Sequence, residues 1–327
     1  MRVLVTGGAG YIGSITNNLL IDKGIETVVF DNLSCGHKES VGDSKLVIGD
    51  LKKPKDVEKA FELGPFDAVV HFAALALAGE SMEKPFKYYE NNIIGGLNLL
   101  EAMRENNCKT MVFSSTCAVY GFPDDLPVTE KESYKPVSVY GSSKRCFEEI
   151  IEWYGKIYNF KYINLRYFNA SGAALDGKLG EDHEDETHII PIAIETALGK
   201  RQEFTVFGDD YETSDGTCIR DYIHVLDLAD AHIKAIKYLG SGGESAAINL
   251  GVGRGYSNLE VLDMIEKVSG NKINRKIGKR RKGDPDSIYA DNSKAKKLLN
   301  WTPMHSDLET IVQSAWNWHT YKSERQI

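Results

Sequence analysis

The sequence predicts an α/β fold built on a doubly wound parallel sheet, followed by a second, smaller α/β region. Three observations predict it. Strand-like and helix-like segments alternate through the first half of the chain. The strand-like segments are near-continuous apolar runs, which is typical of parallel strands buried on both faces. A glycine-rich turn joins the first strand to the first helix, as it does in the Rossmann fold.

The expected elements follow one another at short intervals. Short apolar runs predict strands at Val3–Thr6, Thr27–Phe30, Leu46–Ile48, Ala68–Phe72, Thr110–Ser114 and Tyr162–Arg166. Helical periodicity marks Ser14–Lys23, Glu83–Glu105, Ser142–Tyr158, Leu226–Tyr238, Asn258–Ser269 and Leu308–Lys322. The stretch 175–187 is rich in glycine and acids and predicts a long loop. We expect one domain over 1–169 and a second over 170–327, with some later segments returning to the first.

Composition and charge narrow the class of protein. The chain has 327 residues, is 42% hydrophobic and carries a formal net charge of −8, which predicts a globular protein of about two domains. The acidic balance argues against binding to nucleic acid or to an anionic membrane. No apolar run reaches the roughly 18 residues of a membrane span. Five scattered cysteines without a CxxC pair predict free thiols, no metal site and a reducing, cytoplasmic location.

The glycine-rich turn predicts a dinucleotide site. The sequence TGGAGYIG at 6–13 places Gly7, Gly10 and Gly13 between a strand and a helix, where backbone N–H groups can approach a pyrophosphate. Asp31 ends the second strand and can accept hydrogen bonds from the adenosine ribose hydroxyls. Its charge would repel a 2′-phosphate, so the sequence favours NAD over NADP. Asp50, after the third strand, is a weaker candidate for the adenine end.

A candidate catalytic group follows the fifth strand. Tyr140 and Lys144 lie four residues apart on a predicted helix and so share one of its faces. A nearby ammonium favours the phenolate, so we expect Lys144 to lower the pKa of Tyr140 and make it a general base for a sugar hydroxyl. Thr116 could share a hydrogen bond with the same hydroxyl. The plain alternative is a surface pair on a helix, with Thr116 as a turn residue.

Longer motifs carry a family resemblance that covers essentially the whole chain. The segments TGGAGYIG, NNIIGGLNLLEAM, FSSTCAVYG, YGSSK and RYFNASGA resemble the extended short-chain dehydrogenase/reductase family. The second half, from GEDHEDETHIIP through CIRDYIHV to RRKGDPDSIYAD, is similar to the UDP-glucose 4-epimerases, also called UDP-galactose 4-epimerases. This resemblance implies the interconversion of UDP-galactose and UDP-glucose by hydride transfer from sugar C4 to bound NAD and back, through a 4-keto sugar. Tyr140 would be the base, and Lys144 would bind the nicotinamide ribose.

The resemblance also implies the binding residues. Cofactor contacts fall on Gly7, Gly10, Tyr11, Ile12, Gly13, Asp31, Asn32, Asp50, Leu51, Phe72, Ala73, Ala74, Asn91, Ser114, Tyr140, Lys144 and Tyr167. UDP-sugar contacts fall on Thr116, Tyr140, Asn169, His188, the backbone of Ile189, Phe207, Arg220, Arg281 and Asp284. The two arginines would clamp the pyrophosphate, and Asp284 would bind the uridine ribose. For Phe207 and Tyr167 a packing role, and for His188 a loop hydrogen bond, fit as well.

Alternatives and departures accompany the resemblance. A related dehydratase would need an Asp-Glu pair after the threonine, where Cys117 and Ala118 stand. A 4-epimerase of UDP-N-acetylhexosamines or UDP-pentoses fits the same motifs, because Ile288 is intermediate between the large and small residues that relatives carry there. Ala76 replaces a lysine that some relatives place near the cofactor. A non-catalytic NAD-binding regulator is disfavoured by the presence of both Tyr140 and Lys144. The resemblance further implies a homodimer through a four-helix interface.

Overall fold

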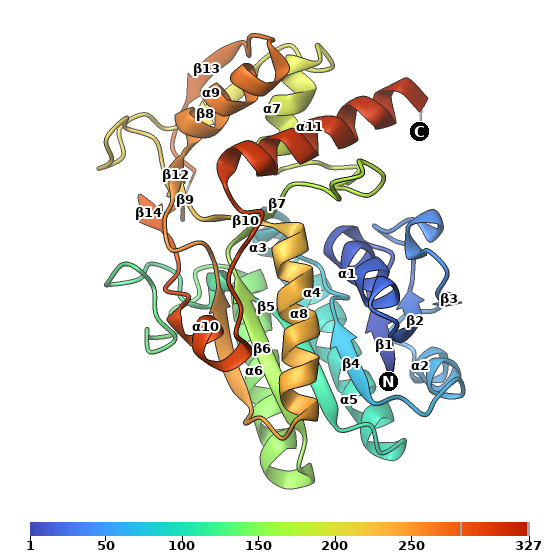
Figure 1. Ribbon diagram of the computed structural model, residues 1–327. Coiled ribbons are helices and arrows are strands. Elements are labelled where there is room, and N and C mark those ends of the chain that lie inside the picture. The colour runs from blue at the N-terminus through green and yellow to red at the C-terminus, as the bar shows by residue number, and fades with distance from the viewer. Residues whose placement is uncertain (282, 326–327) are drawn as a thin grey trace.

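The computed structural model describes residues 1–281 and 283–325, and its centre is a seven-stranded parallel sheet (Figure 1). In chain order its strands are β1 (Arg2–Thr6), β2 (Glu26–Asp31), β3 (Lys45–Ile48), β4 (Ala68–His71), β5 (Thr110–Thr116), β6 (Lys161–Tyr167) and β11 (Ala246–Leu250). They are arranged in the order β11-β6-β5-β4-β1-β2-β3. The chain therefore builds outward from β1 to one edge and then to the other, which confirms the predicted doubly wound fold.

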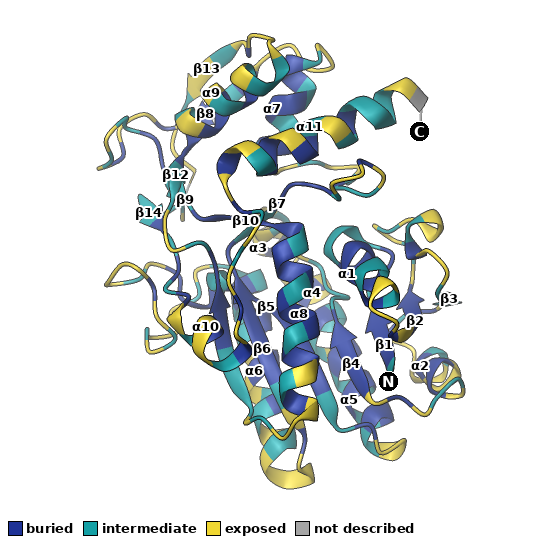
Figure 2. Ribbon diagram, viewed as in Figure 1, coloured by how far each residue is buried: buried dark blue, intermediate teal, exposed yellow. Residues whose placement is uncertain are grey.

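Successive side chains of each strand enter two different cores. Val3 and Val5 pack in a cluster with Leu228, whereas Leu4 packs with Leu99 and Phe147 on the opposite face. The first face is covered by α1 (Tyr11–Asp22) and α8 (Val225–Gly240), the second by α2 (Pro54–Phe61), α5 (Gly95–Glu105) and α6 (Val139–Tyr158). Except for β3 at the edge of the sheet, the strands are buried throughout most of their length (Figure 2). Burial on both faces explains why they read as continuous apolar runs.

The predicted long helix over Glu83–Glu105 is wrong as a single element. The chain forms α3 (Ala78–Glu83), α4 (Pro85–Tyr89), a π-helical turn η2 (Glu90–Ile94) and then α5. The break falls at Lys84, whose φ of −125° and ψ of 59° are not helical. A proline disfavours the helical conformation in the residue before it, and Pro85 then begins the next helix at a position that proline favours. The helical turn at Glu90–Ile94 brings Asn91 to the central cavity described below.

A smaller region lies above the sheet in Figure 1 and contains a separate apolar core. Its helices are α7 (Ile189–Ala197), α9 (Asn258–Ser269) and α11 (Leu308–Arg325). Its strands form the pairs β8 (Phe204–Phe207) with β13 (Arg275–Gly278) and β7 (Asn169–Ser171) with β10 (Tyr222–His224), and the trio β12 (Tyr256–Ser257), β9 (Ile219–Arg220) and β14 (Ser287–Ile288). Ser257 and Glu260 form a capping box that fixes the start of α9.

The chain returns to the large sheet after building part of the smaller region. β11 pairs with β6, and α10 (Ser293–Leu299) packs against α8 and β11. The short helical turns η1 (Lys38–Val41) and η3 (Cys117–Val119) follow β2 and β5. Among the described residues, no helix is both long and apolar enough to cross a membrane.

Candidate active site

A cavity of about 1320 Å³ lies where the carboxyl ends of the sheet strands meet the smaller region. Such a crevice is where open α/β sheets bind their ligands. One wall comes from the glycine turn and from the ends of β2, β4, β5 and β6; the other comes from Asn169, the loop before α7, Arg220 and the segment before β14. Residues that the sequence predicts for cofactor and for substrate therefore line one continuous space. All of the predicted site residues except Ile189 and Phe207 lie on its wall.

The glycine turn leaves room for a ligand at the start of α1. Gly7 has a φ of +73°, and a Cβ on Gly13 would lie 2.1 Å from the Gly7 carbonyl oxygen, so both positions need glycine for the turn itself. A Cβ on Gly10 would meet only that oxygen, at an ordinary 3.5 Å. Gly10 caps α1 without a side chain, and no acidic residue occupies the first turn. The free N–H groups there suit an anionic ligand.

These glycines predict different failures on substitution. Gly10→Ala should leave the free energy of unfolding within about 1 kcal/mol of the parent, because its φ of −82° suits alanine, while NAD affinity falls by about tenfold or more. Gly13→Ala should destabilise the fold, because its Cβ would overlap backbone. Urea unfolding and NAD titration on both variants separate the two effects. Equal losses of stability would contradict a ligand-specific role for Gly10.

Asp31 ties the glycine turn to the end of β2. Its Oδ2 accepts a hydrogen bond from the Ala9 N–H at 3.0 Å, and its Oδ1 accepts one from the Leu33 N–H at 2.8 Å. The residue is buried and still lines the cavity. Each carboxylate oxygen has a further lone pair, so the group can also accept from a ribose hydroxyl. Asn32, Asp50 and Leu51 line the same end of the cavity.

Tyr140, Lys144 and Thr116 meet at the opposite end. Ser138 caps α6 by accepting a hydrogen bond from the Gly141 N–H at 3.1 Å, which places Tyr140 in the first turn. The Lys144 ammonium donates to the Ser114 carbonyl at 2.7 Å and lies 4.8 Å from the centre of the Phe113 ring. Thr116 ends β5, and its hydroxyl accepts from the Ala118 N–H at 3.1 Å. Two elements far apart in sequence thus present one hydroxyl, one phenol and one amine to the cavity.

The expected lowering of the Tyr140 pKa by Lys144 is wrong for the protein alone. Burial raises the pKa of Tyr140 to about 12, although its hydrogen bond with Thr116 opposes the shift. Burial also lowers the pKa of Lys144 to about 7, against the pull of Glu148. The physical reason is that the ammonium is directed to the Ser114 carbonyl while both groups are desolvated. A positive charge bound in the cavity is what would favour the phenolate.

The smaller region supplies a cationic wall. Arg220 Nη1 donates to the carbonyls of Ile219 and Pro285, each at 2.8 Å. Its Nη2 lies 3.6 Å from Asp284 Oδ1 but is buried without a hydrogen-bond partner among residues 1–281 and 283–325. Arg281 Nε donates to the other oxygen of Asp284 at 3.1 Å. A buried donor without a partner costs free energy, so its presence on the cavity wall fits an anionic ligand.

Other predicted residues occupy the remaining wall or lie beside it. The Asn169 side chain donates to the Asp221 carbonyl at 3.0 Å, and Tyr167 hydrogen-bonds Ser114. Ile189 begins α7 away from the wall. Phe207 is 39% exposed and lies under the Arg281 guanidinium, 5.0 Å from ring centre to Cζ. Neither of the last two lines the cavity, and Ile189 packs instead against the core of the smaller region.

Glu181 and His183 are titratable residues on the wall to which the sequence prediction assigns no role. Together with Glu186 they surround His188, whose Nδ1 lies 2.8 Å from Glu181 Oε1 and 3.0 Å from Glu186 Oε1. Desolvation of the imidazole opposes its charge, but the two carboxylates outweigh it and raise the pKa of His188 to about 10. The acids and histidines of 181–188 could have indicated this cluster from the sequence. A loop has no periodicity, however, so the sequence does not show which of these side chains come together.

Comparisons with known proteins identify the family to which the chain is similar. The model of the NAD dependent epimerase/dehydratase family matches residues 3–251. A UDP-glucose 4-epimerase of Streptococcus mutans is 48% identical over 98% of this chain and 97% of its own length. The crystal structure of a UDP-glucose 4-epimerase from Brucella ovis in complex with NAD has a TM-score of 0.94 at 46% identity, covering 96% of this chain and 97% of that one.

A third relative was solved with two ligands. The UDP-glucose 4-epimerase from Bifidobacterium longum, in complex with NAD⁺ and UDP, has a TM-score of 0.93 at 38% identity and covers 99% of both chains. These matches confirm the resemblance that the sequence motifs indicate. The glycine turn, the Tyr140–Lys144 pair and the full-length similarity agree, and the chain belongs to the NAD dependent epimerase/dehydratase family.

Proposed function

We propose that this protein is a UDP-glucose 4-epimerase that interconverts UDP-galactose and UDP-glucose with NAD as its cofactor. The observation that carries the proposal is the convergence on one cavity of the Tyr140 phenol and the partnerless Nη2 of Arg220. The first suits proton transfer at a sugar hydroxyl, and the second suits a diphosphate. Full-length relatives with this activity support the choice of substrate.

The chain's own residues divide the work. The N–H groups at the start of α1 and the Asp31 carboxylate would hold NAD, which would supply reversible hydride chemistry at the sugar. Tyr140 takes the proton of the sugar 4-hydroxyl, and Thr116 forms a hydrogen bond with the same hydroxyl. Lys144 lies beside Tyr140, and its remaining N–H donors would form hydrogen bonds with the cofactor ribose. Because burial raises the pKa of Tyr140, this residue would need a positive charge bound in the cavity to act as a phenolate at neutral pH.

Arg220 is proposed to hold the diphosphate of the substrate. Arg220→Met keeps an unbranched, flexible side chain, although a shorter one, and removes the charged donors. Hydrogen bonds to charged groups contribute about 1.5–3 kcal/mol, so we expect KM for UDP-galactose to rise by about 10- to 150-fold with a smaller change in kcat. Steady-state kinetics measure both constants. A fall in kcat at unchanged KM would contradict a binding role.

The division into domains and the remaining contacts belong to the same proposal. Residues 1–169, joined by α8, β11 and α10, would bind NAD, and the rest of 170–327 would bind the UDP-sugar. Asn169, Arg281 and Asp284 would contact the UDP-sugar from the wall of the cavity. A cytoplasmic location is supported by the five cysteines, all of them free thiols, because reducing compartments keep thiols in that form.

A homodimer is also part of the proposal. Large apolar side chains are exposed on the adjoining helices α4 and α6 and on the π-helical turn: Phe86, Tyr89, Ile94, Trp153 and Ile157. Phe86 is 76% exposed and Ile157 61% exposed, which is costly unless a partner covers them. Sedimentation should show a dimer, and Trp153→Glu should convert it to a monomer. Met304 is also exposed but lies outside this surface, so Met304→Glu should leave the dimer intact. A monomeric parent protein would refute the interface.

The activity is tested on the purified protein without added NAD. UDP-galactose and UDP-N-acetylgalactosamine are supplied separately, and the product sugars are identified by proton NMR. UDP-glucose from the first substrate is the expected result, and it would also show that NAD is retained despite Ala76. The relative rate on the second substrate reports on Ile288, which is buried on the cavity wall. No product from either, even with NAD added, would refute the proposal and favour a UDP-pentose or a regulatory role.

A further inference from the structure

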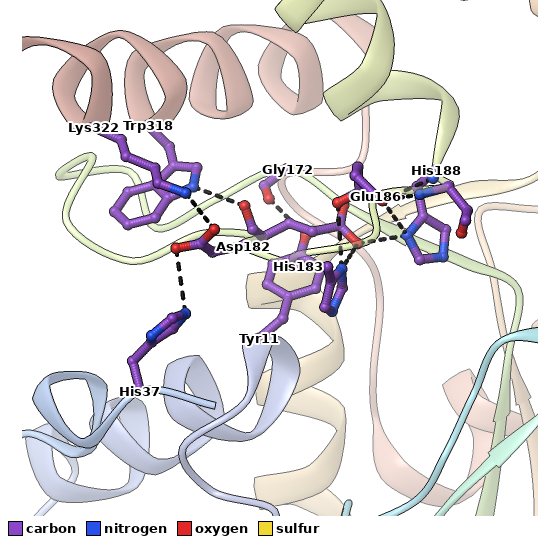
Figure 3. Close-up of polar contacts among 11 residues, drawn as sticks. Tyr11, His37, Gly172, Asp182, His183, Glu186, His188, Trp318 and Lys322 are labelled. Carbon is purple, nitrogen blue, oxygen red and sulfur yellow. Dashed lines mark hydrogen bonds and ion pairs between the residues drawn. The ribbon is translucent and has the colours of Figure 1, made fainter. Parts of the chain in front are cut away.

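Two histidines and two glutamates converge in the loop that precedes α7. One ligand atom from each of Glu181, His183, Glu186 and His188 lies within 4.8 Å of all the others. Figure 3 shows the imidazoles of His183 and His188 directed toward the carboxylates between them. We propose that this cluster binds one divalent transition-metal ion of the zinc class. This inference goes beyond the proposed reaction and does not depend on it.

The distances fit four-coordinate geometry. His183 Nδ1 lies 3.4 Å from Glu181 Oε1 and 3.3 Å from Glu186 Oε2. His188 Nδ1 lies 2.8 and 3.0 Å from Oε1 of the same two glutamates. Ligand atoms around tetrahedral zinc, bonded at about 2.0–2.2 Å, are separated from each other by roughly 3.3 Å. With Glu186 Oε1 as its ligand atom, three of the six edges of such a tetrahedron, at 3.4, 2.8 and 3.0 Å, are therefore within about half an ångström of the needed length.

The charges fit as well. The side chains of Glu181 and Glu186 are each 6% exposed. Within residues 1–281 and 283–325, the two histidines are the only groups that form ion pairs with them. Metal binding requires neutral imidazoles and releases their protons, so a bound ion would face two carboxylates that the histidines no longer compensate. A divalent cation supplies two positive charges. Two nitrogen and two oxygen donors suit zinc, cobalt or nickel better than magnesium or calcium, which prefer oxygen alone.

Neighbouring contacts hold the loop so that the donors are already placed. Glu186 Oε1 accepts from the backbone N–H groups of Thr187 and His188, each at 2.8 Å. The Glu181 carbonyl accepts from the Trp318 indole at 2.9 Å, and Asp182 pairs with Lys322 of α11 (Figure 3). Such contacts orient metal ligands and raise affinity. Glu181, His183 and His188 also line the cavity, which gives an ion a path to the site.

The site would couple the two halves of the cavity. Tyr11, in the glycine turn, donates from its hydroxyl to the Gly172 carbonyl at 2.6 Å, where the loop begins. The negative charges of Glu181 and Glu186 add to burial in raising the pKa of Tyr11, which shows that this hydroxyl lies within their field. A bound cation would cancel that field and fix the loop between the cofactor side and α11. We therefore expect metal to raise the thermal unfolding temperature of the protein.

The experiment uses the full-length protein with its cofactor, stripped of metal by a chelator that is then removed. Equilibrium dialysis against Zn²⁺ measures stoichiometry and Kd, and Co²⁺ titration reports geometry through its visible absorption. We expect one equivalent of either ion, with the strong visible bands of four-coordinate cobalt and no thiolate-to-cobalt charge-transfer band. His183→Gln and Glu186→Gln should each weaken binding by about tenfold or more.

Matched variants separate this site from accidental binding. His37→Gln removes a histidine that pairs with Asp182 at 3.3 Å but supplies no donor to the cluster, so it should bind as the parent does. Cys35→Ser removes an exposed thiol on the cavity wall and should also leave binding unchanged. Circular dichroism of each metal-free variant verifies its fold. Absence of saturable binding, or parental affinity in a folded His183→Gln, would overturn the proposal.

Discussion

Tyr140→Phe should lower kcat for the UDP-galactose reaction by about 10²- to 10⁴-fold, the usual contribution of a positioned acid or base. The half-buried phenol lies on the cavity wall beside Thr116, and the substitution removes one oxygen without changing the packing of the ring. Binding of NAD and of UDP should therefore change little. The loss should appear in kcat and kcat/KM alike, which identifies an interaction made in the transition state.

A matched tyrosine tests the specificity of that result. Tyr167 also lines the cavity and hydrogen-bonds Ser114, but its hydroxyl has no partner role in the proposed proton transfer. Tyr167→Phe should retain kcat within about tenfold, well above the Tyr140→Phe enzyme. Retention of full epimerase activity in Tyr140→Phe would show that another group removes the proton.

Glu148→Gln should destabilise the fold by about 3–5 kcal/mol. Glu148 and Arg166 are both fully buried, and the guanidinium donates to the two carboxylate oxygens at 2.6 and 2.9 Å. Arg166 also donates to the hydroxyls of Tyr120 and Tyr134 at 2.9 and 3.0 Å. Removing the negative charge leaves a buried cation without compensation, beneath the helix that carries Tyr140. Urea unfolding measures the change as a lower midpoint.

An exposed pair provides the control. Glu309 pairs with Lys267 at 3.1 Å, and both side chains are about three-fifths exposed. Solvent and salt screen such a pair, so Glu309→Gln should cost less than about 1 kcal/mol. The double variant Glu148→Leu/Arg166→Met should recover part of the loss, because it removes both charges. If Glu148→Gln and Glu309→Gln have equal effects, the buried pair does not stabilise the fold as described.

Local sequence patterns were sufficient to predict the parallel sheet and the glycine turn. The turn at 6–13 and the strands beside it depend on neighbouring residues, so composition and period reveal them. The helical periodicity of the sequence continues across Pro85, so it does not reveal the break at Lys84. The strands β9, β12 and β14 contain two residues each, and no period can be seen in two residues. They exist only because distant segments pair.

The site also contains features that neighbouring residues predict and features that depend on distant ones. Tyr140 and Lys144 are four residues apart, so their common helix face could be predicted. The direction of the Tyr140 pKa could not, because it depends on burial by groups from several elements. The partnerless Nη2 of Arg220 and the convergence of the 181–188 side chains likewise depend on tertiary contacts. Sequence identified the chemical groups, and the structure determined their surroundings.

The proposed reaction requires that the hydrogen on C4 of UDP-galactose is kept at C4 of UDP-glucose, because bound NAD would take it up as hydride and not release it as a proton to water. UDP-galactose labelled with deuterium at C4 tests it most directly, in ordinary water and without added NAD. The account predicts UDP-glucose that keeps deuterium at C4, measured by NMR and mass spectrometry. Product carrying hydrogen from water at C4 would contradict it, because the label would then have left as an exchangeable proton rather than as a hydride.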